Sequence, residues 1–273
     1  MIIREASCKN PQMNEILQFN DEASIKLLDM YRTPDIKTQR QEFLQFVKSG
    51  PEKRILDVGS GAGFFTSDLA KAVGPSGWVC GIDISNQMLN LARKRCAQQP
   101  WVEFRQADAT RLPFQEQHFD VVVSMQVLEY VIDIRTALSE FYRVLRPGGQ
   151  VVLMDTDWDS LVWYSIAPER ANHILAEWNS HVAYPYLPRT LTQLLLEAGF
   201  QVERPHIMPI FNPIYAANTF SNRLIDLIVP FVSQRGNIPT GEVEAWAQDL
   251  RRSGEGGQYF FSLNRYVFSA SRP

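Results

Sequence analysis

Short apolar runs alternate with helical patterns through the middle of the chain. Each run is rich in Val, Ile, Leu or Phe and ends at a glycine or a polar residue, as a strand buried on both faces does. Between the runs, apolar residues recur every three or four positions, which predicts amphipathic helices. Because strands that alternate with helices form parallel sheets, the pattern predicts an α/β fold with helices on both faces of the sheet. Strands are expected at 54–58, 78–83, 102–108, 119–124 and 150–155.

Two helices are predicted ahead of the first strand. The first has an apolar stripe within residues 12–30, and the second begins at Thr33 and Pro34, which suit the start of a helix. Gly50 and Pro51 end the second helix. We expect residues 1–49 to form a helical lid over the core at 50–157. The stripe of the first helix consists of Ile16, Phe19, Ala23, Leu27 and Met30.

The chain after the fifth strand carries a second set of elements. Helical patterns cover 168–180, 191–198, 220–231 and 243–250, and further strands are expected near 200–207 and 258–269. Seventeen aromatic residues follow position 157, against 14 before it, which favours an aromatic, mostly apolar pocket in this half. We assign 158–198 and 212–255 to a helical cap. Segments 199–211 and 256–273 then complete a seven-stranded, mostly parallel sheet.

Composition and charge limit the possible partners. The chain of 273 residues is 45% hydrophobic and has a formal net charge of −3 without a long Lys/Arg run. Nucleic acid is therefore not expected, because phosphate contacts require clustered cations. Residues 1–11 lack the apolar core of a signal peptide, and no stretch of about 18 apolar residues occurs, so we expect a cytoplasmic protein without integral membrane association. The oligomeric state stays open.

The cysteines indicate neither disulfide bonds nor a metal site. Cys8, Cys80 and Cys96 are odd in number, far apart in the sequence and without Cys-x-x-Cys spacing. We therefore expect ordinary thiols and no bound metal.

A glycine-rich loop joins the first predicted strand to the next helix. Gly59, Gly61 and Gly63 lack side chains that would keep a ligand from the backbone. The helix that follows offers unpaired N–H groups and the positive end of its dipole. A carboxylate, ribose or phosphate is expected to dock there. A dinucleotide site of the Gly-x-Gly-x-x-Gly type would need glycine at position 64, where this chain has Phe64.

Three aspartates recur at nearly equal spacing near the carboxyl ends of consecutive strands. They are Asp57, Asp83 and Asp108. A parallel winding brings them to one edge of the sheet, where open α/β sheets bind ligands. A carboxylate one βα unit after a glycine loop can accept hydrogen bonds from both ribose hydroxyls, which suits Asp83. Asp108 can accept a hydrogen bond from an adenine amino group.

Residues 57–63, Asp-Val-Gly-Ser-Gly-Ala-Gly, resemble motif I of the class I S-adenosylmethionine-dependent methyltransferases. The stretch from Phe119 to the Pro-Gly-Gly at 147–149 resembles the second half of the same core, in the small-molecule branch that contains ubiquinone and menaquinone methyltransferases. The resemblance covers about 50–157. It implies a Rossmann-like fold, S-adenosylmethionine as cofactor, S-adenosylhomocysteine as product and no metal.

The resemblance also implies roles in donor binding. In the family, the acid of the second strand holds the ribose, the Asp-Ala pair after the third strand holds the adenine, and the end of the fourth strand meets the methionine amine. Many relatives carry histidine after the glutamate that follows the fourth strand, but here Tyr130 follows Glu129, so no histidine role transfers. The donor-site residues are expected to be Asp57, Gly59, Ser60, Gly61, Gly63, Asp83, Ile84, Met88, Asp108, Ala109 and Ser124, with Tyr31 and Arg40 from the lid.

The acceptor is expected to be a bulky, largely apolar small molecule, such as a natural product, methylated on N or O rather than C. A general base is needed only if the acceptor arrives protonated with a high pKa. His181, Asp157, Asp159 and His173 are the candidates. His181 and Asp157 are preferred, because both lie in segments that a helical stripe does not explain. Further acceptor contacts are expected from Gln126, Tyr130, Trp158, Asp159, Trp163 and Arg189.

Two other functions share parts of the pattern. An NAD(P)-dependent oxidoreductase would have the same winding and ribose acid, but Phe64 breaks its glycine pattern. A non-catalytic S-adenosylmethionine-binding scaffold would keep the glycine loop and lose the acceptor pocket. Methylation of adenine or glutamine amides is disfavoured because Ser-Met-Gln-Val stands at 124–127 in place of an Asn-Pro-Pro-Tyr or Asp-Pro-Pro-Tyr sequence. Arsenite methylation is disfavoured by the cysteine positions.

Overall fold

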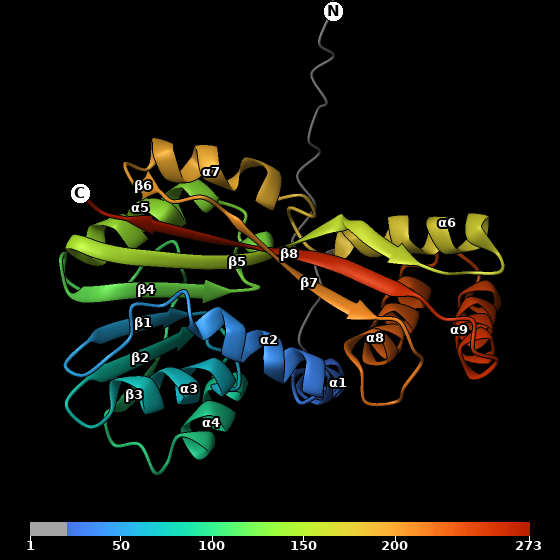
Figure 1. Ribbon diagram of the computed structural model, residues 1–273, viewed down its shortest axis with the longest axis horizontal. Helices are drawn as coiled ribbons and strands as arrows, with labels where there is room; N and C mark the ends of the chain where they lie inside the picture. Colours follow the sequence, from blue (N-terminus) through green and yellow to red (C-terminus); the bar gives the residue numbers. More distant parts are fainter. Residues whose placement is uncertain (1–20) are drawn as a thin grey trace, which may run out of the picture.

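A mixed sheet forms the centre of the molecule. The computed structural model describes residues 21–273, and the side chains of residues 26–273. In this part of the chain the sheet has eight strands in the order β3-β2-β1-β4-β5-β8-β6, with β7 also paired to β8 (Figure 1). The α/β class and the mostly parallel sheet are therefore confirmed. The strands are β1 (Arg54–Val58), β2 (Trp78–Asp83), β3 (Val102–Gln106), β4 (Phe119–Met125), β5 (Leu145–Trp163), β6 (Gln201–Val202), β7 (His206–Asn212) and β8 (Phe261–Ser271).

The first five strands are parallel to one another, and β8 pairs antiparallel with each of its neighbours. β1 pairs with β2 and β4, β2 with β3, and β4 with β5, all in parallel. β8 runs antiparallel to β5, β6 and β7. The count is eight rather than the expected seven because the sixth strand is interrupted at 203–205, where Pro205 offers no N–H to the ladder.

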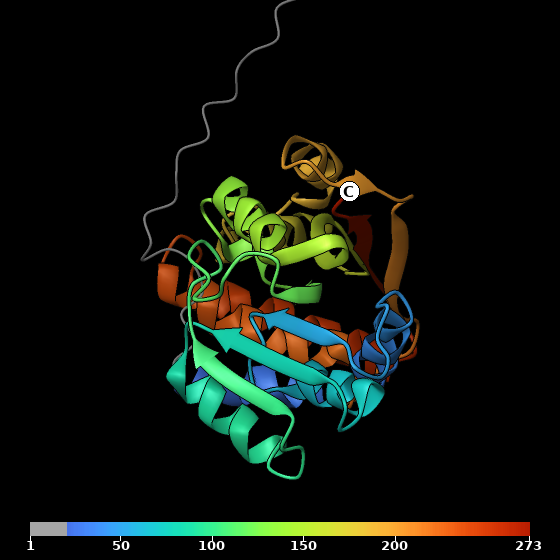
Figure 2. The same ribbon diagram turned by 90° about the vertical axis from the view of Figure 1, so that its left-hand side faces the viewer.

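Helices cover both faces of the sheet. α2 (Pro34–Leu44), α3 (Phe64–Val73) and α4 (Asn86–Arg95) lie on one face, and α5 (Ile134–Val144) and α7 (Pro188–Glu197) on the other (Figures 1 and 2). The alternation of side chains along β1 supplies both cores. Ile55 packs with α2 and α3, whereas Leu56 and Val58 pack with α5 and α7.

A second core fills the other end of the molecule. There α1 (Asp21–Tyr31), α6 (Pro168–Trp178), α8 (Phe220–Arg235) and α9 (Thr240–Glu255) pack around the ends of β5, β7 and β8 (Figure 1). Trp178 and Trp246 are among its largest buried side chains. β5 and η1 (Leu128–Tyr130) contribute residues to both cores and therefore lie at the middle of the molecule.

The fifth strand is longer than the sequence pattern predicts. It was expected to end at position 155, but β5 runs on to Trp163 because β8 continues beside it, pairing Val162 with Ser262 and Trp163 with Phe261. The register is irregular between Asp157 and Val162. Part of the first predicted helix, at 12–20, and Cys8 lie outside the described residues, whereas Cys80 and Cys96 are free, buried thiols.

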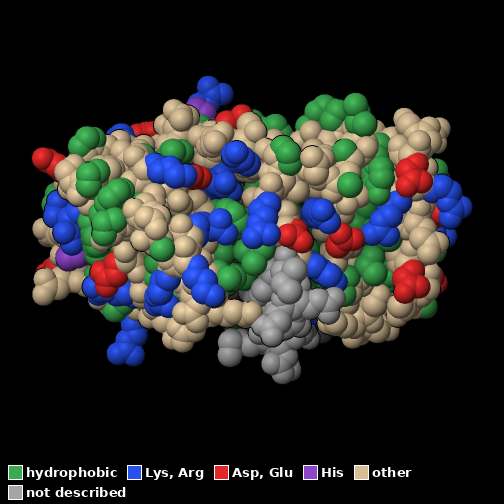
Figure 3. Space-filling view, turned by 90° about the horizontal axis from the view of Figure 1, so that it is seen from below, with side chains coloured by type: hydrophobic (Ala, Val, Ile, Leu, Met, Phe, Trp, Pro, Cys, Tyr) green, Lys and Arg blue, Asp and Glu red, His purple; other side chains and the backbone are tan. Residues whose placement is uncertain are grey.

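The charged side chains on the face of α1 to α4 are mixed in sign. Figure 3 shows Lys and Arg spread over this side of the molecule with Asp and Glu between them. Several of these cations are paired, as in the contacts of Arg32 with Asp29 and of Lys71 with Asp68. The absence of a nucleic-acid partner stays a prediction. Within residues 21–273, none of the helices is both long and apolar enough to cross a membrane.

Candidate donor and acceptor sites

The glycine loop after β1 has the backbone shape that a ligand site needs. Gly59 has φ +70°, and a side chain there would place its Cβ 2.3 Å from Val127 Cγ2. Gly61 has φ +51°, and a Cβ there would meet nothing within 4 Å. Glycine is therefore required at Gly59 by close packing, whereas at Gly61 it leaves open space beside the backbone, where a ligand can approach.

Asp83 links this loop to the second strand. Its Oδ2 accepts a hydrogen bond from the Gly61 N–H at 2.9 Å, and its Oδ1 accepts one from the Ser85 N–H at 2.8 Å. Burial raises the pKa of Asp83, and these two N–H groups partly offset that effect. The side chain thus stands beside the open space at Gly61, and its role in holding the donor ribose stays a prediction.

The other two aspartates also lie at this edge, with different surroundings. Asp57 is buried under the loop, where its Oδ2 accepts a hydrogen bond from Thr66 Oγ1 at 2.6 Å, and burial raises its pKa to about 7. Asp108 is exposed, and its Oδ1 accepts from both the backbone N–H and the hydroxyl of Thr110. The parallel pairing of β1, β2 and β3 brings the three together. Asp57 supports the loop from within, Asp83 is partly buried beside the loop, and Asp108 is exposed.

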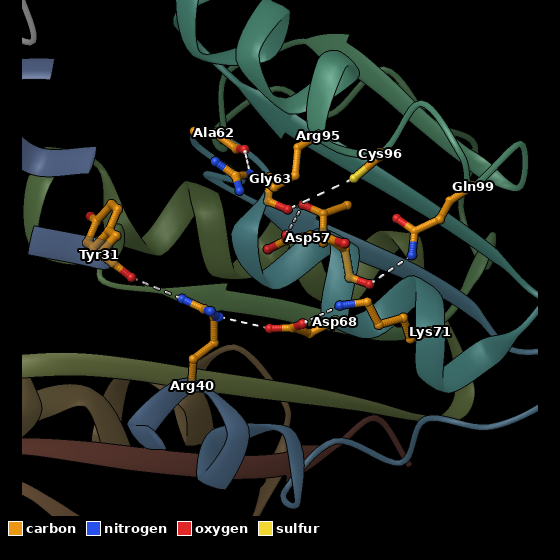
Figure 4. A network of polar contacts seen from close by, with 12 residues as sticks. Tyr31, Arg40, Asp57, Ala62, Gly63, Asp68, Lys71, Arg95, Cys96 and Gln99 are labelled. Carbon is orange, nitrogen blue, oxygen red and sulfur yellow. Dashed lines mark hydrogen bonds and ion pairs between the residues drawn. The ribbon is translucent and has the colours of Figure 1, made fainter. Parts of the chain in front are cut away.

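The lid residues reach the same edge through a network of polar contacts (Figure 4). Arg40 Nε lies 2.8 Å from Asp68 Oδ2, and its Nη1 donates to the Tyr31 carbonyl at 3.4 Å. Arg95 donates from Nε to the Ala62 carbonyl at 2.7 Å, and its guanidinium lies 3.4 Å from the centre of the Phe64 ring. Arg95 was not among the predicted residues, because a basic residue in the last turn of a helix is common on surfaces.

The remaining donor-site residues fit a bound S-adenosylmethionine. The hydroxyls of Ser60 and Ser124 are buried and have no hydrogen-bond partner among the described residues. Ile84 is 68% exposed directly after Asp83, where an adenine ring would cover it. Met88 and Ala109 are buried behind this edge. These open polar and apolar groups are those that a ligand with a ribose, an amino acid and an aromatic base would satisfy.

A small cavity adjoins the carboxyl end of β4 and the part of β5 around Trp158. Its volume is about 30 Å³. Val127 packs against Gly59. Its chain neighbours Gln126, Glu129 and Tyr130 line the cavity, so the cavity lies next to the glycine loop. The cavity is lined by Leu27, Met30, Tyr31, Gln126, Glu129, Tyr130, Trp158, Trp178, His181, Phe220, Leu224, Leu227 and Arg265.

Glu129 is the buried acid of this cavity. Its Oε2 accepts a hydrogen bond from Trp158 Nε1 at 3.0 Å. Burial raises its pKa to about 7, while the Arg265 guanidinium and the Trp158 bond act to lower it. Asp155, behind Glu129, accepts a bond from the Glu129 N–H, and burial raises the pKa of Asp155 well above its usual range. Glu129 is thus the carboxyl group here that can change charge near neutral pH.

His181 supplies a nitrogen atom to the same cavity. It belongs to η2 (Asn179–His181), where its ring stacks on Trp178 with centroids 3.8 Å apart. Nδ1 lies 2.6 Å from the Trp178 carbonyl, and Nε2 is buried without a hydrogen-bond partner among the described residues. Burial lowers the pKa of His181 to about 3, so the ring is neutral at physiological pH.

Several of the predicted acceptor residues lie away from the cavity. Asp157 does not line it, because both of its carboxylate oxygens accept hydrogen bonds from Arg189, at 2.8 and 2.9 Å. Arg189 also bonds Asp159 Oδ2 at 2.9 Å and is half-exposed. Trp163 packs in the second core against Trp246 and Phe261. The inference that Asp157 lies in an irregular segment was wrong, since it is part of β5.

The structure brings together residues that the sequence did not single out. Of the predicted acceptor residues, Gln126, Tyr130, Trp158 and His181 line the cavity. The cavity also includes Glu129, Arg265 and the apolar side chains of α8. Glu129 and Arg265 were not among the predicted site residues. Among residues 21–273 there is no group of three or more metal-binding side chains that could hold a metal ion.

Comparisons with known proteins bear on the family to which the chain belongs. A model of a methyltransferase domain matches residues 56–153. An uncharacterized 37.1 kDa protein in transposon TN4556 of Streptomyces fradiae is 32% identical over 252 residues, covering 90% of this chain and 70% of that protein. The demethylmenaquinone methyltransferase of Lactococcus lactis is 42% identical over 117 residues, which cover 42% of this chain and 46% of that enzyme. The chain thus matches less than half of the menaquinone enzyme.

A solved structure shows the same fold over nearly the whole chain. It is the Haemonchus contortus phosphoethanolamine N-methyltransferase 2 in complex with phosphomonomethylethanolamine and S-adenosylhomocysteine, with a TM-score of 0.62 and 18% identity. The similarity covers 96% of this chain and 60% of that one. Together with the glycine loop and the ordered aspartates, these similarities show that the chain belongs to the class I S-adenosylmethionine-dependent methyltransferases.

Proposed function

We propose that the protein transfers the methyl group of S-adenosylmethionine to a small, bulky and largely apolar acceptor. The single observation that carries the proposal is the position of the cavity. It lies beside the glycine loop, and its walls are mostly apolar and aromatic side chains from α1, α8 and the end of α6. Such walls favour an apolar body with few polar groups, as in lipid-like metabolites and natural products.

The reaction needs positioning more than protein-derived reactive groups. The methyl of a sulfonium is already activated, so displacement requires the nucleophile, the carbon and the departing sulfur to lie in line. A site that holds both reactants and excludes water can contribute several kcal/mol to such a step. Gln126, Tyr130, Trp158 and His181 are the predicted acceptor residues that this proposal retains, because they line the cavity. Asp157 and Arg189, which bond each other outside it, are left out.

The experiment that tests the proposal has two arms. Calorimetry measures binding of S-adenosylmethionine and of NADH to the purified protein, and we expect only the former to bind. The protein is then incubated with donor and a metabolite extract, and mass spectrometry searches for a gain of one methyl group in a small molecule. Formation of S-adenosylhomocysteine with a methylated small molecule supports the proposal. Methylation confined to protein or nucleic acid contradicts it, and binding without turnover indicates a scaffold.

A further inference from the structure

The cavity has one polar end, where some hydrogen-bonding groups have partners and others do not. Glu129 and His181 present acceptor atoms, and Arg265 presents a cation. Gln126 is already engaged by its neighbours, since its Oε1 accepts from Thr156 Oγ1 at 2.5 Å and its Nε2 donates to the Met154 carbonyl at 3.3 Å. The polar end therefore has one acceptor that lacks a donor, His181 Nε2, beside the Glu129 carboxylate and the positive charge of Arg265.

His181 cannot meet its own need for a donor. A carbonyl oxygen only accepts hydrogen bonds, so the Nδ1 that faces the Trp178 carbonyl carries the ring proton. In the neutral ring Nε2 is then a bare lone pair, buried and without a partner among the described residues. A buried acceptor without a partner is costly, which indicates that a ligand brings an O–H or N–H group to this end.

Arg265 limits what that group can be. It is buried, and its side chain donates to neutral groups, from Nε to Thr156 Oγ1 at 3.3 Å and from Nη1 to Gln39 Oε1 at 2.5 Å. The Glu129 carboxylate favours its charge from the wall of the same cavity. A ligand ammonium group would be repelled by this guanidinium, and a carboxylate or phosphate would oppose Glu129 without offering a donor. A neutral hydroxyl offers a hydrogen-bond donor and carries no charge that Arg265 or Glu129 would repel.

Resting on the proposed function, we propose that the acceptor presents a hydroxyl of phenolic or enolic acidity to this end of the cavity and is methylated on that oxygen. Glu129 accepts the hydroxyl proton, and Arg265 pairs with the oxygen as negative charge develops on it. His181 Nε2 accepts a hydrogen bond from the same hydroxyl or from a neighbouring donor of the acceptor. Glu129 is thereby a catalytic residue, and Arg265 stabilises the charge that forms.

The step balances without a further reactant. The hydroxyl oxygen forms a bond to the methyl carbon while the bond from that carbon to the sulfonium sulfur breaks, and its electron pair stays on sulfur. The proton of the hydroxyl passes to the Glu129 carboxylate. The products are a methyl ether, S-adenosylhomocysteine and protonated Glu129, which later releases its proton to water.

The surroundings of Glu129 set the pH at which it can act. Its pKa of about 7 means that the carboxylate form grows as pH rises through neutrality. His181 is neutral there, and burial keeps the phenols of Tyr31 and Tyr130 protonated, so the charged group that faces Glu129 is Arg265. The titratable groups around Glu129 are Tyr31 on α1, Tyr130 on η1, Asp155 on β5, His181 on η2 and Arg265 on β8.

The test uses three probes with one apolar body: 4-hexylphenol, 4-hexylaniline and 4-hexylbenzoic acid. Donor binding to the wild-type protein is measured first by calorimetry, and methylation of each probe is then followed by mass spectrometry. We expect the phenol to be methylated on oxygen at a rate at least about tenfold above the other two. Glu129→Gln keeps the size and the acceptor for Trp158, and Glu197→Gln on α7, an outer carboxylate paired with Arg135, is the matched control.

We expect Glu129→Gln to lower the rate with 4-hexylphenol about 100- to 10,000-fold at pH 7, with donor affinity unchanged. The rate of the variant should then climb with pH toward about 10, where the phenol ionises by itself. The control should behave as the wild type does. A wild-type pH profile in Glu129→Gln overturns the role of Glu129. Preference for the aniline or the acid, or methylation of none of the three by donor-loaded protein, overturns the acceptor class. Failure to bind the donor would instead overturn the proposed function.

Discussion

Asp83 is the residue on which donor binding is expected to depend most directly. Its carboxylate stands at the end of β2 beside the open space at Gly61 and can accept both ribose hydroxyls. We expect Asp83→Ala to weaken binding of S-adenosylmethionine by roughly 2 to 3 kcal/mol, the scale of hydrogen bonds to a charged group. Calorimetry measures the change, with Asp249→Ala on α9, paired with Arg170, as the control. Equal affinities for Asp83→Ala and the wild type would sink the assignment.

Gly61 is expected to lack a side chain because the ligand, rather than another part of the protein, occupies the space beside it. Nothing in the protein lies within 4 Å of a Cβ built there, but the donor would. We expect Gly61→Val to abolish donor binding, because the side chain occupies the approach path and the φ of +51° strains a β-branched residue. Gly61→Ala separates the two effects, since it carries the backbone strain of an L residue at this φ but adds only a methyl group to the approach path. Thermal unfolding checks that both variants fold. Normal binding by Gly61→Val would mean that the loop is only a turn.

Asp57 makes stability depend on pH in an unusual direction. Burial raises its pKa to about 7 in the folded chain from the usual 3.8, so between these values the folded state holds a proton that the unfolded state has lost. The free energy of unfolding should therefore fall as pH rises from about 4 to 7, by up to about 1.4 kcal/mol per pH unit for each such group. Asp57→Asn should remove the contribution of Asp57 to the pH dependence of the free energy of unfolding, whereas the raised pKa of Glu129 still contributes. Denaturant unfolding at several pH values measures the slopes, and equal slopes in variant and wild type would contradict the raised pKa.

At the scale of elements, the first five strands and the helices between them could be predicted because their signals are local. Apolar runs, glycine breaks and acids at strand ends all lie within a few residues of the feature they specify. The donor edge follows from these signals, since parallel pairing then places the carboxyl ends of the strands that carry Asp57, Asp83 and Asp108 at one edge of the sheet. The continuation of β5 to Trp163 could not be predicted in this way. Residues 156–163 mix polar and apolar side chains, and β8, from far along the chain, makes them a strand.

The walls of the acceptor cavity depend on contacts that a single sequence does not reveal. The helical stripes predicted α8 but not that it would face α1 across a cavity. Arg265 looks like an exposed residue of a strand, yet it is buried because α2 and α8 pack over β8 at that point, where Gln39 and Phe220 contact its guanidinium. The ion pairs of Arg189 likewise join β5 to α7, which are separate elements of the chain. Long-range packing thus decides which polar residues become part of the site.

α8 is expected to set the size of the acceptor that fits. Leu224 on α8 lines the cavity, whereas Leu250 on α9 is equally buried in the same core but does not line it. Both Leu224→Ala and Leu250→Ala should lower the free energy of unfolding by about 2 to 5 kcal/mol. Only Leu224→Ala should shift the preference among 4-alkylphenols toward longer chains, measured as relative methylation rates. The same shift in both variants would show that looser packing, rather than the cavity wall, is responsible.

At the scale of the whole molecule, α1 connects the second core to the donor edge. The first core holds the donor edge, and the second holds most of the acceptor walls. α1 belongs to the second core, yet its last residue, Tyr31, contacts Phe64 at the start of α3, with ring centroids 6.3 Å apart. Glu129 in the cavity and Asp83 at the donor edge both act to raise the pKa of Tyr31, which burial brings to about 12. Tyr31 therefore stands between the two sites.

This position predicts that donor and acceptor bind cooperatively. The cavity of about 30 Å³ is far smaller than 4-hexylphenol, so we expect its walls, α1 and α8 among them, to move apart when an acceptor enters. A bound donor that contacts Tyr31 fixes the end of α1, so that the acceptor orders less of the chain when it binds. We expect S-adenosylhomocysteine to tighten binding of 4-hexylphenol about 5- to 150-fold, and 4-hexylphenol to tighten S-adenosylhomocysteine by the same factor. Calorimetric titrations in both orders measure the two factors. Tyr31→Phe, which removes only the hydroxyl, should reduce both factors together, and independent binding of the two ligands to the wild type would contradict the coupling.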